Sequence, residues 1–306
     1  MGMAENGHAR RRTQIVAVGN QKGGVGKTTN TVHIATALGE MGRRCLIIDL
    51  DANSGATRHF GIPPLSFMGT FEMLVGDEAP EDLALSNGDS DLVLPTNVDI
   101  IPCRRKIEDI DEALLAKFGK FFVKQKVLIE PLESLRGKYD YVFLDTAPQA
   151  TTPTVAAYMA ADWFLLSALP EHFAIQGLQD ALQDIKDAKE NRDPGKPLRL
   201  LGVIVSGVDR RTSLAHRLTE YVEKLFAVDE NISAKFATVV SHSTVVPQAQ
   251  ELGKTVFQTV PRHRVTEQFR EVAHEIEKRI EPYAYETEAT SRAGEGAAKT
   301  RVTANA

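Results

Sequence analysis

The chain has 306 residues, of which 42% are hydrophobic and 25% are charged, and its formal net charge is −5. This length leaves room for one large α/β domain or two small ones, and the composition is that of an ordinary globular protein. The acidic balance excludes a basic field over the whole molecule, so any binding of nucleic acid has to come from a local patch of Lys and Arg.

Apolar runs typical of buried strands alternate with amphipathic segments typical of helices from residue 14 to about residue 280. The strand-like runs cover residues 14–20, 43–51, 97–103, 139–146, 163–169, 198–208, 237–240 and 255–260. The helical patterns cover residues 28–42, 124–137, 172–190, 212–226 and 265–280. Continuous apolar runs separated by helices predict an α/β fold, with a mostly parallel sheet that helices cover on both faces. In the last helical pattern one apolar stripe is expected to pack on the sheet, formed by Val265, Phe269, Val272, Ile276 and Ile280.

We expect one folded domain over residues 13–285, between a disordered basic tail at 1–12 and a disordered polar tail at 286–306. The first residues carry no apolar stretch behind their charges, which argues against a secretory signal. No run of about 18 apolar residues is present, so no membrane span and a cytoplasmic location are expected. Cys45 and Cys103 lie far apart inside apolar runs, which predicts two buried thiols rather than a disulfide or a metal pair.

A glycine-rich segment, NQKGGVGKTTN at residues 20–30, lies between the first strand-like run and the first helical pattern. In this position backbone N–H groups of a turn converge on phosphate oxygens at the N-terminus of a helix. The turn consists of Gly23, Gly24, Val25 and Gly26. Lys27 is placed for the β- and γ-phosphates of a nucleotide, the Thr28 hydroxyl for Mg²⁺, and Thr29 for a further phosphate. The segment therefore predicts a nucleotide-binding loop.

The loop nevertheless departs from the standard pattern G-x-x-x-x-G-K-[ST], because Gln21 stands where that pattern has glycine. It also carries a second lysine, Lys22, which has no role in the standard scheme. Residues 21–29, QKGGVGKTT, resemble the deviant phosphate loop of the ParA/MinD family of ATPases. In that family the extra lysine crosses the interface of a nucleotide-sandwich dimer and contacts the ATP of the partner subunit. The resemblance implies this role for Lys22, whereas the residues alone also allow a plain surface charge.

Acidic residues follow two of the strand-like runs. Asp49 and Asp51 share one side of their strand by alternation, and Asp145 ends the run YDYVFLD. Carboxylates at strand ends suit hydrated Mg²⁺ and the positioning of water. DLDANSGAT at residues 49–57 resembles the family's DLDPQGNAT switch, and YVFLD resembles its Walker-B strand. The resemblance implies that Asp51 orients the attacking water, that Asp49 lies near the water shell of the metal, and that Asp145 holds Mg²⁺ through water.

The resemblance covers about residues 14–280 and is closest to the ParA-type, Soj-like partition ATPases. It implies a P-loop NTPase fold, hydrolysis of ATP to ADP and phosphate with Mg²⁺, and formation of a homodimer on ATP binding. It further implies non-specific binding to double-stranded DNA of the nucleoid and stimulation by a ParB-like partner. The function that follows is partition or positioning of plasmid or chromosomal DNA. MinD-type membrane binding is not expected, because the chain ends in a polar tail without an apolar stripe.

DNA contact requires clustered Lys and Arg, since its affinity comes from neutralised phosphates. VPRHR at residues 260–264 resembles the family's DPRSRG segment and gives the candidates Arg262 and Arg264, with Arg270 on the helix that follows. Further basic candidates are Arg210, Arg211, Arg217 and the four lysines of residues 117–126. Solvated surface charge is the other interpretation of all of these residues. Residues 239–246, VVSHSTVV, lack the arginines of the family's IPRNVRL segment, so DNA contact has shifted or a different cargo is bound.

Two alternative functions stay open at this point. A ParA-like ATPase that positions a cargo other than DNA would use the same fold and the same loop. A metabolic phosphate-loop enzyme, such as a dethiobiotin-synthase-like ligase or a small-molecule kinase, would instead need an acceptor pocket and turnover that is independent of dimerisation. The second lysine and DLDANSGAT argue against the metabolic enzyme.

Overall fold

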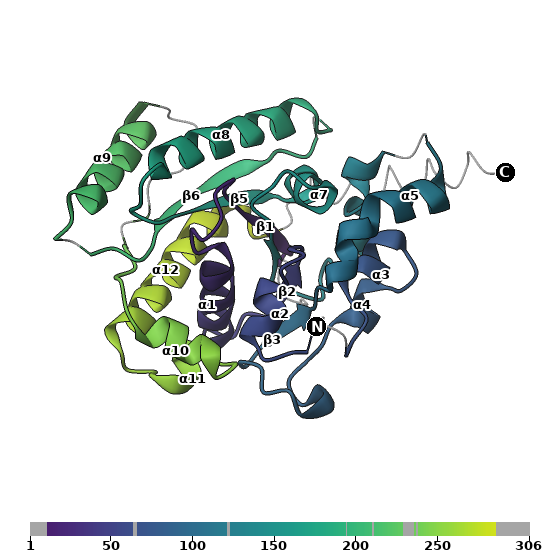
Figure 1. Ribbon diagram of the computed structural model, residues 1–306, viewed down its shortest axis with the longest axis horizontal. Coiled ribbons are helices and arrows are strands. Elements are labelled where there is room, and N and C mark those ends of the chain that lie inside the picture. Colours follow the sequence, from purple (N-terminus) through teal and green to yellow (C-terminus); the bar gives the residue numbers. More distant parts are fainter. Residues whose placement is uncertain are drawn as a thin grey trace, which may run out of the picture.

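The computed structural model describes residues 11–63, 66–120, 123–193, 195–209, 211–228, 236 and 238–285. Its described strands form a six-stranded sheet in the order β3-β2-β4-β1-β5-β6, and every pair of neighbours is parallel (Figure 1). The strands are β1 (Gln14–Gly19), β2 (Cys45–Asp49), β3 (Val98–Ile101), β4 (Tyr141–Asp145), β5 (Trp163–Ala168) and β6 (Arg199–Val205). The predicted parallel sheet is confirmed.

Helices cover both faces of this sheet, as the continuous apolar strands require. Alternation divides the buried side chains of β1, so that Ile15 and Ala17 face one apolar core while Val16 and Val18 face the other. The first core lies under α3 (Thr70–Val75), α5 (Ile110–Phe118), α6 (Ile129–Ser134), α7 (Thr152–Ala160), α8 (Ala174–Glu190) and α9 (Ser213–Val228). The second core lies under α1 (Lys27–Glu40), α10 (Val245–Glu251), α11 (Val256–Thr259) and α12 (Arg264–Ile280) (Figure 1). The remaining short elements are α2 (Gly55–His59), α4 (Pro80–Leu83), and the 3₁₀ turns η1 (Asp89–Asp91), η2 (Arg105–Asp109), η3 (Lys124–Lys126) and η4 (Glu281–Tyr283).

The apolar stripe predicted for the last helix is confirmed. Phe269, Val272 and Ile276 of α12 are buried in the second core, where the helix packs against α1. Cys45 and Cys103 are both buried and free, as their apolar surroundings indicate.

Two strand predictions near the end of the chain differ from the structure. The run 255–260 contains the helix α11 instead, because Thr255 and Gln258 form a capping box in which the Thr255 N–H donates to Gln258 Oε1 at 2.9 Å. Within the run 237–240, residue 237 lies outside the described residues, and 238–240 form no strand. Val240 still hydrogen-bonds β6, since its N–H donates to the carbonyl of Val205 at 3.0 Å.

The helix predicted over residues 124–137 is shorter in the structure, where α6 spans Ile129–Ser134. Pro131 explains the late start, because its ring clashes with the carbonyl four residues earlier and it has no N–H for a preceding turn.

The beginning and the end of the described chain meet next to the N-terminal end of β1, at the end of the sheet opposite to the carboxyl ends of the strands. Arg11 and Tyr285 form an antiparallel bridge, and the Arg12 N–H donates to the carbonyl of Ala284 at 2.7 Å. Arg11 also pairs with Glu277 of α12 at 2.7 Å. Residues 1–10 and 286–306, which include most of the two predicted tails, lie outside the described residues. Among the helices that are described, none is both long and apolar enough to cross a membrane.

Candidate functional site

The loop after β1 and the ends of its neighbouring strands enclose a cavity of about 260 Å³. Parallel strands place their carboxyl ends at one edge, where the crevices of open α/β sheets bind ligands. The cavity is lined by Gly23, Gly24, Val25, Gly26, Lys27, Thr28, Thr29, Asp51, Asn53 and Pro148. All seven loop residues predicted to contact phosphate therefore share one cavity.

Glycine is needed in this loop for a backbone reason. Gly24 and Gly26 have φ angles of +75° and +83°, a region that side chains with a Cβ disfavour. Gly26 is also the residue that caps the N-terminus of α1, so the free N–H groups of the first helical turn open toward the cavity. A helix N-terminus with this geometry stabilises negative charge, as a phosphate group requires.

A buried network of three polar side chains holds the loop from behind. Ser167 of β5 donates through Oγ to the carbonyl of Val25 at 2.7 Å and accepts from Asn30 Nδ2 at 2.7 Å. Ser206, just after β6, donates to Asn30 Oδ1 at 2.8 Å. These residues were missed in the sequence, because small polar side chains at strand ends give no signal until the strands are placed side by side.

Lys27 lies inside the cavity with only 6% of its surface exposed. Burial lowers the pKa of its ammonium group, and the charges of Asp145 and Asp51 oppose that effect. Its Nζ donates to the carbonyl of Lys22 at 3.1 Å. The position is the one that the sequence predicts for a lysine that binds phosphate.

Asp49 and Asp145 end neighbouring strands and are register partners in the sheet. The Thr28 hydroxyl donates to Asp145 Oδ2 at 2.7 Å, and Thr57 donates to Asp49 Oδ2 through its hydroxyl at 2.7 Å and its N–H at 2.9 Å. Burial and, second to it, the charge of Asp49 raise the pKa of Asp145 to about 7. Burial also raises the pKa of Asp49 to about 6, against the hydrogen bonds from Thr57.

This donor set fits Mg²⁺. Two adjacent buried carboxylates and the Thr28 hydroxyl offer only hard oxygen ligands. The pKa values of the two carboxylates are raised mainly because burial disfavours their charged form, which a bound cation would stabilise. The three residues predicted for the metal, Thr28, Asp49 and Asp145, are therefore brought together, with Lys27 beside them.

Asp51 differs from its prediction in one respect. The strand β2 ends at Asp49, so the two aspartates do not alternate along one strand. Instead the N–H of Asp51 donates to Asp49 Oδ1 at 3.2 Å, and Asp51 Oδ1 accepts from the N–H and from Nδ2 of Asn53, both at 2.9 Å. The half-buried carboxylate lies between the loop cavity and a second cavity of about 380 Å³, because it lines both. This place suits a group that orients a water molecule.

Lys22 extends away from the loop cavity. Its Nζ donates to Glu171 Oε2 at 2.8 Å and to the carbonyl of His172 at 2.9 Å, in the segment between β5 and α8. The side chain does not line the cavity of its own subunit. Glu171 is a further residue that sequence reasoning missed, although the resemblance includes its segment.

The basic candidates lie in different surroundings. Arg264 and Arg211 line a polar hollow of about 290 Å³ together with His242, and Asp209 lies beside Arg211 at 2.7 Å. Arg262 is exposed two residues before Arg264. Arg270, in contrast, pairs with Glu40 at 2.9 Å and with Glu267 at 3.1 Å. Arg210 lies outside the described residues.

Comparisons with known proteins agree with this geometry. Residues 13–195 match the family described as AAA domain. The chromosome partitioning protein ParA of Caulobacter vibrioides is 30% identical over 79% of this chain and 86% of its own length. The chromosome-partitioning ATPase Soj of Thermus thermophilus is 28% identical over 89% of this chain and 98% of its own.

Among solved structures, cobyrinic acid a,c-diamide synthase of Mycobacterium smegmatis with an ATP analogue and magnesium superposes with a TM-score of 0.68. It is 25% identical and covers 86% of this chain and 93% of that one. The family match, the ParA and Soj relatives and the shared fold together show that this chain belongs to the AAA-domain family and, within it, to the ParA/MinD group of ATPases.

Proposed function

We propose that this chain is a dimerising ATPase switch that partitions or positions plasmid or chromosomal DNA. Two copies bind ATP face to face, the dimer binds DNA without sequence preference, and a ParB-like partner stimulates hydrolysis and releases it. The observation that carries the proposal is the direction of Lys22, a loop lysine that does not line its own subunit's cavity. A second copy provides the phosphates that this lysine would contact.

ATP and Mg²⁺ are the cofactors in this proposal. The loop from Gly23 to Thr29 binds the triphosphate through its N–H groups, with Lys27 on the terminal phosphates. Thr28, Asp49 and Asp145 would hold Mg²⁺, which supplies positive charge against the phosphate oxygens. Asp51 orients the attacking water from its place between the two cavities.

The DNA-binding surface is proposed on Arg262, Arg264 and Arg211. The relatives named as chromosome partitioning proteins support DNA as the cargo. Arg264 and Arg211 line the same hollow, so they present positive charge on one surface. Arg270 contributes less, since two acidic side chains already neutralise its guanidinium. Asp209 likewise offsets part of the charge of Arg211 in the hollow, so Arg262 and Arg264 are the main candidates.

A second candidate function is favoured by one observation. The cavity of about 380 Å³ beside Asp51 has the size of an acceptor pocket, and cobyrinic acid a,c-diamide synthase shares the fold. Such a ligase would need an acceptor pocket and a turnover that is independent of dimerisation. The two candidates therefore differ in whether turnover depends on the concentration of protein.

Sedimentation velocity with a non-hydrolysable ATP analogue and Mg²⁺ tests the leading proposal. We expect a dimer with the nucleotide and a monomer without it, and ATP turnover per chain that rises with protein concentration. Lys22→Ala should bind the nucleotide and lose this concentration dependence, because the contact across the interface is gone. Lys138→Ala, a surface change that only removes a pair with Glu81, is the matched control and should behave like the parent chain. A parent chain that stays monomeric with the nucleotide contradicts the proposal and favours the ligase.

A further inference from the structure

One buried residue of the sheet, Ser167 of β5, is bonded to both ends of the phosphate loop. Its hydroxyl donates to the carbonyl of Val25 at 2.7 Å, at the back of the loop. Its own carbonyl accepts from Asn20 Nδ2 at 2.8 Å, and Asn20 Oδ1 accepts from the N–H of Lys22 at 2.9 Å, at the front. Ser167 and Asn20 are both buried, so water does not compete for these bonds.

Asn30 of α1 and Ser206 extend this attachment into a row of hydrogen bonds. Ser206 donates to Asn30 Oδ1 at 2.8 Å, and Asn30 Nδ2 donates to Ser167 Oγ at 2.7 Å. Because an amide NH₂ group only donates, the hydroxyl proton of Ser167 is directed to the carbonyl of Val25. All three donors therefore point toward the loop, and bonds aligned in this way inside a protein strengthen one another.

The direction of the Val25 carbonyl decides the direction of the next N–H. A trans peptide is planar, so the carbonyl of one residue and the N–H of the following residue point in opposite directions. The Val25 carbonyl is directed to Ser167 behind the loop, so the N–H of Gly26 is directed to the front, where Gly26 lines the nucleotide cavity. Asn30 holds the other side of the same glycine, because its own N–H donates to the Gly26 carbonyl at 2.8 Å.

The peptide between Val25 and Gly26 needs this support. Gly26 has a φ angle of +83° and no Cβ, so its backbone rotates more easily than that of other residues. A rotated peptide would present the carbonyl oxygen of Val25 to the phosphate in place of the N–H of Gly26, and the two oxygens would repel each other. Ser167 lies directly behind the glycine, since a Cβ built on Gly26 would be 3.7 Å from Ser167 Oγ.

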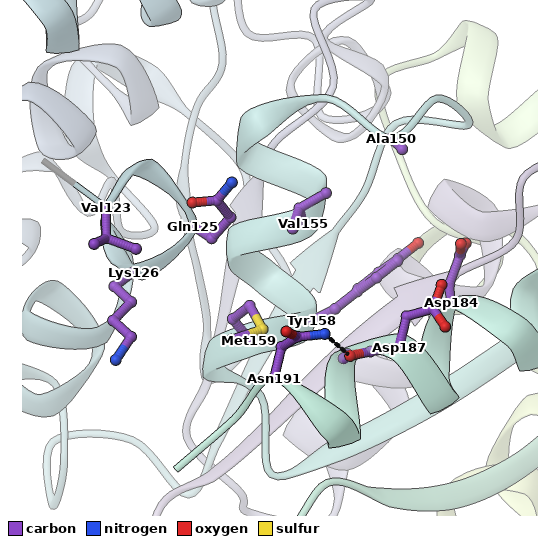
Figure 2. Close-up of a pocket in the computed structure, with 11 residues that line it drawn as sticks. Val123, Gln125, Lys126, Ala150, Val155, Tyr158, Met159, Asp184, Asp187 and Asn191 are labelled. Carbon is purple, nitrogen blue, oxygen red and sulfur yellow. Dashed lines mark hydrogen bonds between the residues drawn. The ribbon is translucent and has the colours of Figure 1, made fainter. Parts of the chain in front are cut away.

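A different attachment of the loop is exposed to water. Asp184 of α8 lines a hollow of about 500 Å³ between η3, α7 and α8, where Figure 2 labels it, and it accepts from Gln21 Nε2 at 2.8 Å. Water competes for both groups of this exposed pair, so the bond adds little to the rigidity of the loop. The buried bonds of Ser167 are therefore the ones expected to hold the loop in shape.

From this geometry we infer that Ser167 and Asn30 are positioning residues for phosphate binding. Neither side chain lines the cavity, and both act through the peptide between Val25 and Gly26. The inference rests on the nucleotide site of the proposed function, and it requires neither a dimer nor DNA.

Binding of a fluorescent, non-hydrolysable ATP analogue with Mg²⁺ tests this role. Ser167→Ala should weaken binding at least about tenfold, because the Val25 carbonyl loses its donor and the peptide can rotate. Asn30→Ala should weaken binding by about threefold, because the Ser167 hydroxyl remains but is no longer oriented. In a chain that already carries Ser167→Ala, adding Asn30→Ala should change the affinity no further, since Asn30 acts through Ser167.

Two control variants separate positioning from other effects. Thr36→Ala removes a buried hydroxyl from the same helix as Asn30, and that hydroxyl donates to the carbonyl of Val32, away from the loop. Asp184→Ala removes the exposed bond to Gln21. Both controls should change the affinity less than about twofold. Urea denaturation without nucleotide measures the fraction of each variant that is folded in the binding assay.

Nuclear magnetic resonance observes the peptide itself. Labelling with ¹³C-carbonyl valine and ¹⁵N-glycine selects the three Val–Gly peptides of the chain, at residues 18–19, 25–26 and 75–76. Of their three glycines only Gly26 lines the cavity. We expect the ATP analogue to shift the amide resonance of Gly26 in the parent chain and to shift it much less in Ser167→Ala, while the resonance of Gly76 stays in place in both.

Three results would overturn the inference. They are an unchanged affinity in Ser167→Ala, a Gly26 resonance of the parent chain that does not respond to the bound analogue, and an effect of Asn30→Ala that is as large with Ser167→Ala as without it. A parent chain that binds the analogue yet stays monomeric would refute the proposed switch and leave the positioning role intact. A parent chain that binds no adenine nucleotide would refute the nucleotide site, and the positioning role with it.

Discussion

At the scale of single residues, the proposed function assigns nucleotide binding and water positioning to different side chains. Lys27 lies in the loop cavity, whereas Asp51 follows β2 and lies between that cavity and the larger one next to it. No hydrogen bond or ion pair joins these two side chains among the described contacts of the loop. Either side chain can therefore be removed by substitution without removing a hydrogen-bond partner of the other.

Asp51→Ala tests this separation. We expect the variant to bind ATP and to dimerise, but to hydrolyse at least about 100-fold more slowly, because water is no longer oriented. Lys27→Ala should instead lose nucleotide binding itself. Calorimetric titration of the ATP analogue and release of phosphate, measured on both variants, distinguish the two roles. Rapid turnover by Asp51→Ala would assign water positioning to another group.

At the scale of elements, two buried histidines join the helices around the loop. His33 of α1 lies between Thr29 and α11, since its Nδ1 hydrogen-bonds the Thr29 carbonyl at 2.8 Å and its Nε2 accepts from the Val256 N–H at 3.3 Å. Its ring stacks on Phe269 of α12 and meets the ring of His59 of α2 edge-on at 5.3 Å. Neither ring nitrogen of His59 has a hydrogen-bond partner of good geometry, although the backbone of Lys254 lies nearby.

This cluster should make the fold sensitive to acid. Burial lowers the pKa of His33 to about 4 and that of His59 to about 3. At pH values between these and the ordinary histidine pKa of about 6.5, both side chains stay neutral in the folded chain, whereas they take up protons in the unfolded chain. The free energy of unfolding therefore decreases as pH falls below about 6.5, by roughly 2 kcal/mol for each histidine at pH 5.

The measurement is urea denaturation of the parent chain and of His59→Leu at pH 7 and at pH 5. The leucine variant should lose less stability between the two values, by about 2 kcal/mol. His216→Gln, which changes an exposed histidine of α9, should follow the parent chain. Asp49 and Asp145 act in the opposite direction because their pKa values are raised, so the difference between variant and parent is the quantity compared. An equal loss of unfolding free energy between pH 7 and pH 5 in His59→Leu and in the parent chain would contradict the argument.

Among the described elements, the sequence alone predicted the six strands, the helices α1, α8, α9 and α12, and the nucleotide loop, because these depend on neighbours in the chain. Periodicity identifies α1 and α12, and the glycines with Lys27 and Thr28 define the loop before any contact across the fold is known. The helix α11 was not predicted, because its apolar β-branched residues are typical of a strand. The capping box at Thr255 is what favours the helix instead. The hydrogen bonds from Lys22 to Glu171 and from Gln21 to Asp184 could not be predicted from the sequence either, because they join residues about 150 positions apart.

At the scale of the whole molecule, DNA binding should depend on one end of α12. Arg262 and Arg264 lie at the start of this helix, and Arg264 shares its hollow with Arg211. Arg262→Glu with Arg264→Glu should weaken binding of duplex DNA by the ATP dimer and reduce the slope of its salt dependence by about two, one for each phosphate contact.

Electrophoretic mobility shift at several salt concentrations measures this effect. Lys278→Glu reverses a charge in the last turn of the same helix and should leave the salt slope unchanged, because it lies about 21 Å from Arg264 along the axis. Retention of the parent slope by the double variant would place DNA binding on another surface, or would indicate a cargo other than DNA.

The bridge between Arg11 and Tyr285 makes the described chain nearly a closed ring. Covalent closure of that ring, by a short peptide from residue 285 to residue 11, would restrict the unfolded chain while leaving the catalytic edge untouched. Cyclisation of this kind offers a way to strengthen the scaffold without altering the chemistry that it supports.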